Sequence, residues 1–399
     1  MVTDSSPRLT TILRSLSPSR RFPVETIRSW FWRPQVAVID FRTKFGVRFA
    51  AEIHETGQSL ELRFVARDRE SQYALQRAVK RLSLPRAVNY SKMPISLAHW
   101  PNTTTNDTVT GDSLVNIQRI LTILNAEELN VSDDSVPCFW WDMRTNFGDI
   151  IGPRIISALS GRPVHNTYGQ PNAGRAIVSV GSILDVVRRN DMTVWGTGLM
   201  NPLTPSRSRE IRQTSWNITA VRGYRTKAQL ESCLQCTLPN VVGDPGLLFP
   251  EVIGRAAVQQ QNDVAVIPHY AHKATLNKQF VESQDCRFID VEQAPETVAV
   301  EIQHSRSVIS TSLHGLILAQ AYEVPWIWLK VEDQHLAGRD FKFEDFFSTV
   351  EAAQVSIETV QSADLPGLDI RALARRARLP EKRYSSSELL NAFPCDDLP

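Results

Sequence analysis

Residues 307–329 read SVISTSLHGLILAQAYEVPWIWL, and this stretch decides the fold class. An apolar run at Ser307–Ile309 leads through a small polar loop at 310–315 into a helix-like segment at Leu316–Tyr322, and a second apolar run follows at Trp326–Leu329. Two short strands joined through a helix are typical of a parallel α/β unit. The loops of such units lie at the carboxyl ends of the strands, where open α/β sheets bind ligands.

Similar apolar runs recur earlier in the chain, and several end in Gly, Ser, Asp, Pro or His before a helical segment. They indicate an α/β fold of two Rossmann-like halves facing a cleft, at 136–245 and 246–360. The tail at 361–399 is expected to be helical, with short helices near 368–378 and 386–393. The earlier runs are Cys138–Trp141, Ala176–Val180, Thr193–Trp195, Asn240–Val242 and Val264–Ile267.

The first 135 residues have a different pattern. Three strand-like runs and an amphipathic helix at Gln72–Leu82 predict a small α+β module at 34–100, to which the sequence assigns no role. Residues 1–33 are interpreted as a leader. Residues 101–135 are interpreted as a linker, because they begin with the polar, turn-rich stretch PNTTTNDTVTGD. The strand-like runs are Val36–Phe41, Val47–Ile53 and Leu60–Val65.

The bulk composition excludes several classes of protein. The chain has 399 residues, of which 42% are hydrophobic and 22% charged, and its formal net charge is +1. This balance argues against nucleic acid as the partner and allows at most peripheral membrane contact. Five scattered cysteines give no disulfide framework, so a reducing, cytoplasmic compartment is expected. The carboxylates Asp149, Asp185 and Asp244 are dispersed, so neither a metal nor a cofactor is expected.

Three glycine-containing loops are candidate anion sites. In Asn146-Phe147-Gly148-Asp149 the glycine permits close backbone approach and the aspartate fits a helix cap. The Gly181-Ser182 turn offers backbone N–H groups to an anion where a helix opens. Gly196 and Gly198, in Trp195-Gly196-Thr197-Gly198, again permit close approach or simply form a tight turn.

Two side chains are candidates for catalysis. Arg222 precedes a helix, and a guanidinium group binds phosphate or carboxylate in a bidentate fork. His314 lies near a helix N-terminus, which disfavours protonated imidazole unless a bound phosphate restores the proton. His314 is therefore a candidate proton donor in the substrate complex, with a buried structural histidine as the alternative.

Eight motifs, taken in order, resemble those of the polysaccharide pyruvyl transferase family over about residues 136–350. One departure is Tyr224-Arg225-Thr226, where the family often has Pro-Leu-Thr. The matching motifs are NFGD at 146–149, GSIL at 181–184, WGTGL at 195–199, RG at 222–223, GDPGLLFP at 243–250, IPHY at 267–270, SLHGLILAQAYEVP at 312–325 and FKFEDFF at 341–347.

This resemblance implies a GT-B-like pair of domains that bind phosphoenolpyruvate and form a pyruvate ketal on a saccharide, which is expected to be lipid-linked at the inner membrane face. Arg222 and His314 match residues that look essential in the family, as donor-binding and acid–base groups. His269 and Tyr270 are expected on the acceptor side. The remaining expected donor contacts are Asn146, Gly148, Asp149, Gly181, Ser182, Gly196, Gly198, Ser312 and Lys342.

Two other functions compete with pyruvyl transfer. A nucleotide-sugar glycosyltransferase would also use two Rossmann-like halves, and binding of a nucleotide sugar instead of phosphoenolpyruvate would favour it. A non-catalytic subunit of a polysaccharide assembly complex is the third reading. The intact Arg222 and His314 motifs argue against that reading.

Overall fold

The computed structural model describes most of the chain as two compact units. One unit takes in residues 1–135 and 167–174, and the other takes in 136–166 and 175–399. No helix in the described part is long and apolar enough to cross a membrane. The described residues are 7–16, 27–33, 35–42, 47–56, 59–81, 93–101, 103–129, 134–170, 174–256, 263–284, 286–395 and 398.

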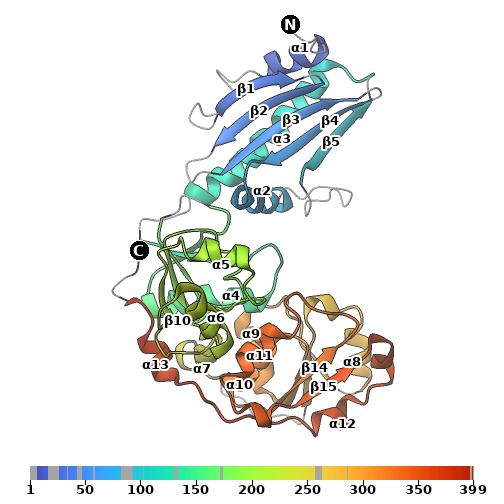
Figure 1. Ribbon diagram of the computed structural model, residues 1–399. Helices are drawn as coiled ribbons and strands as arrows, with labels where there is room; N and C mark the ends of the chain where they lie inside the picture. Colours follow the sequence, from blue (N-terminus) through green and yellow to red (C-terminus); the bar gives the residue numbers. More distant parts are fainter. Residues whose placement is uncertain are drawn as a thin grey trace. The chain divides into compact units, whose positions relative to one another are not determined.

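The first unit is a five-stranded antiparallel sheet covered by helices (Figure 1). Its strands alternate, so that Leu60, Leu62 and Phe64 face the core while Glu61 and Arg63 stay partly exposed. Neighbouring strands pair in chain order, as in a meander. The elements are α1 (Pro7–Ser15), β1 (Ile27–Arg33), β2 (Val36–Arg42), β3 (Arg48–Glu55), β4 (Ser59–Ala66), α2 (Arg69–Arg81), β5 (Ile95–Pro101) and α3 (Asn106–Leu129).

Two predictions for this region are wrong in the described residues. The expected leader contains α1, whose Leu9 and Ile12 are fully buried, and β1, which pairs with β2. Residues 1–6, 17–26 and 34 lie outside the described part. The expected linker contains the long helix α3. Its first turns are polar, which hides the helix from a composition argument, but Val109, Ile117 and Leu121 are buried in the core at helical spacing.

The second unit contains two parallel sheets of five strands each, which confirms the predicted parallel α/β class. The prediction missed four strands: β7, β10, β12 and β15. The first sheet comprises β6 (Val136–Phe139), β7 (Val164–Asn166), β8 (Ala176–Val178), β9 (Met192–Trp195) and β10 (Asn217–Ala220). The second comprises β11 (Asp263–Ile267), β12 (Arg287–Phe288), β13 (Ser305–Ser310), β14 (Trp326–Val331) and β15 (Ile357–Val360).

Both sheets have the same strand order. The first runs β10-β9-β8-β6-β7 and the second β12-β11-β13-β14-β15, so each reads 2-1-3-4-5 in its own numbering. In this order the connections leave the sheet in opposite directions after the first and third strands, which creates a crevice at their carboxyl ends. The crevices therefore lie at the ends of β6 and β8 in one sheet and of β11 and β13 in the other.

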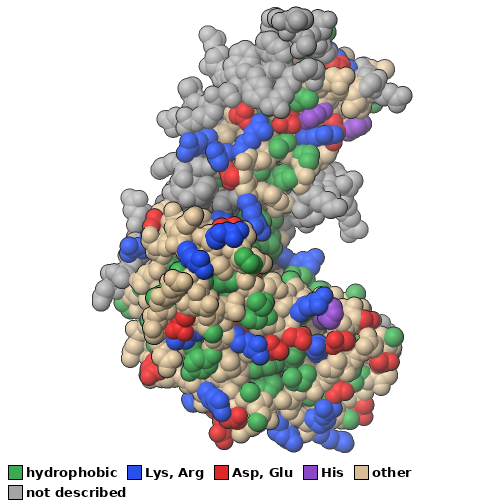
Figure 2. Space-filling view, viewed as in Figure 1, with side chains coloured by type: hydrophobic (Ala, Val, Ile, Leu, Met, Phe, Trp, Pro, Cys, Tyr) green, Lys and Arg blue, Asp and Glu red, His purple; other side chains and the backbone are tan. Residues whose placement is uncertain are grey.

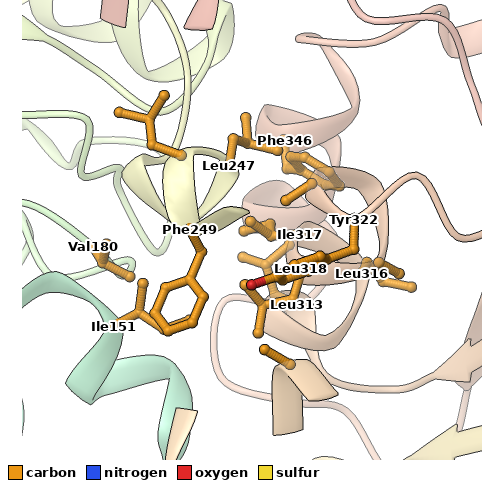
Figure 3. Packing of buried hydrophobic residues seen from close by; sticks show 14 of the residues in the cluster. Ile151, Val180, Leu247, Phe249, Leu313, Leu316, Ile317, Leu318, Tyr322 and Phe346 are labelled. Carbon is orange, nitrogen blue, oxygen red and sulfur yellow. The ribbon is translucent and has the colours of Figure 1, made fainter. Parts of the chain in front are cut away.

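Helices join the strands and bury one continuous core between the sheets. Phe249 lies between Ile151 of the first half and the α10 residues Leu313 and Ile317 (Figure 3). Every residue of α10 is buried. The helices are α4 (Phe147–Ser160), α5 (Pro205–Ile211), α6 (Tyr224–Leu234), η2 (Pro245–Leu248), α7 (Phe249–Val252), η3 (Tyr270–His272), α8 (Lys278–Ser283), α9 (Pro295–Gln303), α10 (Leu313–Ala321) and α11 (Phe341–Phe347).

The C-terminal segment is less helical than predicted. It contains the two short helices α12 (Ile370–Ala374) and α13 (Ser386–Asn391), with η4 (Ala352–Gln354) and η5 (Ser362–Gly367) before them. Between the two helices the chain forms bridges from Arg378 to Trp326 and from Lys382 to Val350. The indole of Trp195 in the first sheet then donates to the Leu389 carbonyl at 2.9 Å, so the tail joins the two halves.

Basic and acidic side chains are interspersed on the face of the second unit shown in Figure 2, in keeping with a formal net charge of +1. The strand expected at 240–242 is only an isolated bridge between Val221 and Val242.

Candidate functional site

A cavity of about 300 Å³ lies where the two crevices of the second unit meet. The first half contributes the loops that follow β6 and β8, and the second half contributes those that follow β11 and β13. Many of its residues were predicted as site residues from the sequence. Its lining consists of Trp141, Asn146, Asp149, Gly181, Ser182, Ile183, Val186, Met200, His269, Tyr270, Ser312, Leu313, His314, Ala337 and Lys342.

Asn146 and Asp149 form the start of α4 at the cavity. The Asn146 side chain is the helix cap and accepts a hydrogen bond from the Gly148 N–H at 3.3 Å. Its Nδ2 donates to Asp149 Oδ2 at 2.9 Å. Asp149 therefore lies in the first turn and is not the cap that its position in the sequence suggested. Because Asn146 caps the helix, the Asp149 carboxylate does not act as the cap and instead lines the cavity.

Arg222 lies behind the cavity wall and does not line it. Its side chain is fully buried, and Nε donates to Asp345 Oδ2 at 2.9 Å. Nη2 donates to the Leu199 carbonyl at 2.8 Å, and Nη1 donates to Ser182 Oγ. Asp345 also accepts from both the N–H and the hydroxyl of Thr226, each at 2.7 Å. The guanidinium group thus reaches the cavity only through Ser182.

Three of the predicted glycines support this wall from outside the cavity. A Cβ on Gly198 would lie 2.5 Å from Arg222 Cζ, and one on Gly196 would lie 2.3 Å from Pro245 Cδ. A Cβ on Gly148 would lie 2.1 Å from the Nδ1 of His314. These glycines permit close packing of Arg222, Pro245 and His314, whereas Gly181, with φ of 103°, lines the cavity itself.

His314 is held in the first turn of α10 with one nitrogen unpaired. The imidazole packs against Gly148 and edge-on to Phe147, with ring centroids 6.4 Å apart. Its Nε2 is buried and has no hydrogen-bond partner among the described residues. Burial, and then the positive charges of Arg222 and Lys342, lower the pKa of His314 to about 3. The side chain is therefore a neutral imidazole at physiological pH.

Lys342 brings a positive charge to the cavity from α11. The side chain is 7% exposed, and no acidic group in the described part of the chain forms an ion pair with it. Burial, and then the charge of Arg222, lower the pKa of Lys342 to about 8, although Asp149 opposes the shift. An ammonium group without a counter-ion in a cavity is suited to binding an anion.

A pair of aromatic rings also lines the cavity. The rings of His269 and Tyr270 lie 4.0 Å apart, and the guanidinium carbon of Arg144 lies 4.4 Å from the centroid of Tyr270. His269 Nδ1 accepts from the Ala271 N–H at 3.2 Å. Burial, and then the nearby charge of Lys342, lower the pKa of His269 to about 3. Both predicted acceptor residues therefore lie at the cavity.

Sequence reasoning missed several apolar lining residues, because isolated apolar side chains look like core. Trp141 is the second residue after β6, and a position after a strand end was the signal that could have marked it. Ala337 and Met200 come from loops of opposite halves and carry no motif. A Cβ on Gly338 would lie 2.4 Å from the Met200 carbonyl oxygen, so these loops meet closely over the cavity.

Comparison with known proteins identifies the domain that carries this cavity. The model of the family described as polysaccharide pyruvyl transferase matches residues 146–333. These residues form a polysaccharide pyruvyl transferase domain. The predicted family resemblance is thereby confirmed for this part of the chain. Trp141 and Lys342 fall outside the matched range but line the same cavity.

Two relatives match parts of this chain. An uncharacterized protein of Acanthamoeba polyphaga mimivirus is 29% identical over 174 residues, which cover 42% of this chain and 58% of the viral protein. The succinoglycan biosynthesis protein ExoV of Rhizobium meliloti (strain 1021) is 23% identical over 269 residues, which cover 63% of this chain and 79% of ExoV. The chain thus spans little more than half of the viral relative.

Gly148→Ala is expected to lower the free energy of unfolding, because the new methyl group would overlap the buried His314 ring. Overpacking of this kind costs about 1–3 kcal/mol, which urea denaturation of the purified protein would measure. Gly367→Ala is the matched control, since a Cβ there meets nothing within 4 Å. Equal stability of both variants would mean that the His314 ring moves away without resistance.

Proposed function

We propose that the protein transfers the pyruvyl group of phosphoenolpyruvate to two hydroxyl groups of a saccharide, forming a cyclic ketal and releasing phosphate. One observation carries the proposal: the motifs converge on one cavity with a neutral imidazole, a carboxyl group and an ammonium group that forms no ion pair within the described residues. The cavity volume of about 300 Å³ is at the small end of ligand sites, which are about 300–1,000 Å³.

The donor has a phosphate and a carboxylate, and the cavity offers several groups that bind anions. Lys342 supplies the positive charge. The N-termini of α4 and α10 and the backbone of the Gly181-Ser182 turn supply N–H groups and favourable dipoles. In this proposal Arg222 does not touch the donor but positions Ser182 and adds its charge from behind the wall.

The saccharide would occupy the aromatic side of the cavity. Tyr270 and Trp141 present ring surfaces there, and His269 adds a polar edge. Sugar rings combine apolar faces with polar rims, and such mixed walls suit them. The GT-B-like arrangement of the two halves, and a lipid-linked acceptor at a cytoplasmic membrane face, are further parts of this proposal.

The direct test is phosphate release from phosphoenolpyruvate by the purified full-length protein, with a panel of β-galactoside, glucoside and mannoside acceptors. Acceptor-dependent release, with a ketal product detected by mass spectrometry, is the expected result. No release with any acceptor, and no thermal shift on adding phosphoenolpyruvate, would contradict the proposal. A thermal shift with a nucleotide sugar instead would favour a glycosyltransferase.

Lys342→Met is expected to weaken donor binding by roughly 10- to 100-fold, because a hydrogen bond to a charged group contributes about 1.5–3 kcal/mol. Since Lys342 loses its proton as pH rises through about 8, wild-type affinity should fall above that pH, whereas Lys342→Arg should retain it. Isothermal titration with phosphoenolpyruvate measures both effects. Lys278→Met, a change on the exposed surface of α8, should leave the dissociation constant unchanged.

A further inference from the structure

Asp149 and His314 occupy neighbouring positions on the cavity wall. Asp149 follows Gly148 in α4, and the His314 imidazole rests directly on Gly148, which has no side chain to separate them. Both side chains line the cavity. Asn146 fixes the carboxylate by donating to its Oδ2 at 2.9 Å. A substrate in the cavity can therefore contact an oriented carboxyl group and the His314 imidazole at the same time.

The charged groups around Asp149 come from three elements. Asp142 lies in the loop after β6, Lys342 in α11, and His314 in α10 is uncharged. Burial, opposed by the Asn146 hydrogen bond, raises the pKa of Asp149 to about 7; Asp142 raises it and Lys342 lowers it. Near neutral pH the carboxyl group therefore exists in both protonated and ionised forms, which is the property that a proton donor and acceptor needs.

His314 has the complementary property. Its pKa is lowered to about 3, mainly by burial, so the free protein holds it as a base. The sequence suggested His314 as the proton donor, but an imidazole that is neutral in the free protein is better suited to accept a proton from a substrate in the cavity. The cavity wall thus holds an acid, Asp149, beside a base, His314. Neighbouring groups whose pKa values are shifted apart in this way often serve as the acid and the base of an enzyme.

We propose that Asp149 is the acid that protonates the methylene carbon of the donor, while His314 is the base that accepts the proton of the attacking saccharide hydroxyl. This assignment rests on the proposed pyruvyl transfer and divides between two residues the proton transfers that His314 alone was expected to perform. It makes Asp149 a catalytic residue and not only a donor contact.

The proton transfers balance over one turnover. First, the C–H bond forms with the Asp149 proton, the hydroxyl oxygen bonds to the central donor carbon, and His314 takes the hydroxyl proton. Next, the bond from that carbon to the phosphate oxygen breaks, its electron pair leaves with the phosphate, and His314 gives its proton to that oxygen. Finally, the second hydroxyl closes the ketal ring and returns a proton to Asp149. Both residues end as they began.

Donor binding supports both roles. A phosphate and a carboxylate in the cavity disfavour a further negative charge, so they keep Asp149 protonated before the reaction. The same negative charge stabilises the imidazolium form of His314 once it has taken the hydroxyl proton. The departing phosphate then removes that proton together with the charge.

Asp149→Asn tests the assignment, because it keeps the shape and removes the transferable proton. The expected result is a loss in kcat of roughly 10²–10⁴-fold, with phosphoenolpyruvate affinity unchanged or tighter, since a negative charge near the anion is gone. In the wild type, kcat/KM should fall as pH rises through about 7, where Asp149 ionises. The remaining activity of Asp149→Asn should lack this decrease and keep only the one near pH 8 from Lys342.

Asp142→Asn is the matched control. It makes the same chemical change in a neighbouring carboxylate that raises the pKa of Asp149, so it should keep kcat at acidic pH, where Asp149 stays protonated, and move the alkaline decrease to lower pH. Asp149→Asn with full kcat, or with weaker donor binding as its main defect, would overturn the assignment. If the wild type shows no acceptor-dependent phosphate release, the proposed function itself fails, and that result comes before any variant is compared.

Discussion

His314→Gln is expected to lower kcat by roughly 10²–10⁴-fold, the usual contribution of a well-placed acid–base group. Glutamine fills most of the imidazole volume beside Gly148, so the buried wall should stay intact. It cannot accept and return a proton as an imidazole does. Because His314 is uncharged in the free protein, its loss should change the dissociation constant of phosphoenolpyruvate only slightly. Steady-state phosphate release and calorimetric donor binding would separate the two effects.

His304→Gln is the control for this change. His304 caps the C-terminal end of α9, does not line the cavity, and should tolerate glutamine with full activity. A His314→Gln variant that retains wild-type kcat would show that the imidazole only fills space between α4 and α10. That result would also remove the base from the proposed proton transfers.

Much of the site could be predicted because parallel sheets bring loop ends together. Ser182, His269 and His314 are far apart in the chain, but each lies within a few residues of the carboxyl end of a parallel strand. The carboxyl ends of such strands meet at one edge of a sheet, so their loops share a cavity. Several of the strands are apolar enough to be recognised from the sequence, and the candidate site residues lie just after them.

The repeated strand order could not be predicted. β7 has three residues and β12 only two, and both are half-buried, so neither has a clear apolar run. These are the second strands of the two sheets, and without them the order 2-1-3-4-5 and the facing crevices do not emerge from the sequence. Helix α3 was missed for a similar reason, since its buried residues begin only after a polar first turn.

The position of Arg222 could not be predicted either. A guanidinium group beside a helix start fits an anion clamp, and nothing in the local pattern points to a carboxylate 123 residues further along the chain. Asp345 lies within the aromatic motif FKFEDFF, where it resembles an ordinary surface acid. Folding places it, fully buried, against Arg222 and Thr226.

Breaking this pair should destabilise the protein strongly. Arg222 is in the first half and Asp345 in the second, and both side chains are 0% exposed. Removing one partner of a buried pair leaves an uncompensated charge and costs about 3–5 kcal/mol. Arg222→Met and Asp345→Asn should each lower the free energy of unfolding by that amount, measured by urea denaturation. Activity should fall in parallel, because Ser182 loses the group that holds it.

A double-mutant cycle distinguishes this structural role from direct donor binding. If the two side chains act as a pair, the double variant should be less destabilised than the sum of the single changes, with a coupling energy of about 0.5–3 kcal/mol. The ion pair of Arg225 and Glu344 is the matched control, since it joins the start of α6, just after Arg222, to α11 at 3.1 Å but is 51% and 42% exposed. Exposed pairs contribute about 0–1 kcal/mol. If Arg222→Met instead kept full stability and lost only donor affinity, the guanidinium group would have to leave Asp345 and contact the donor.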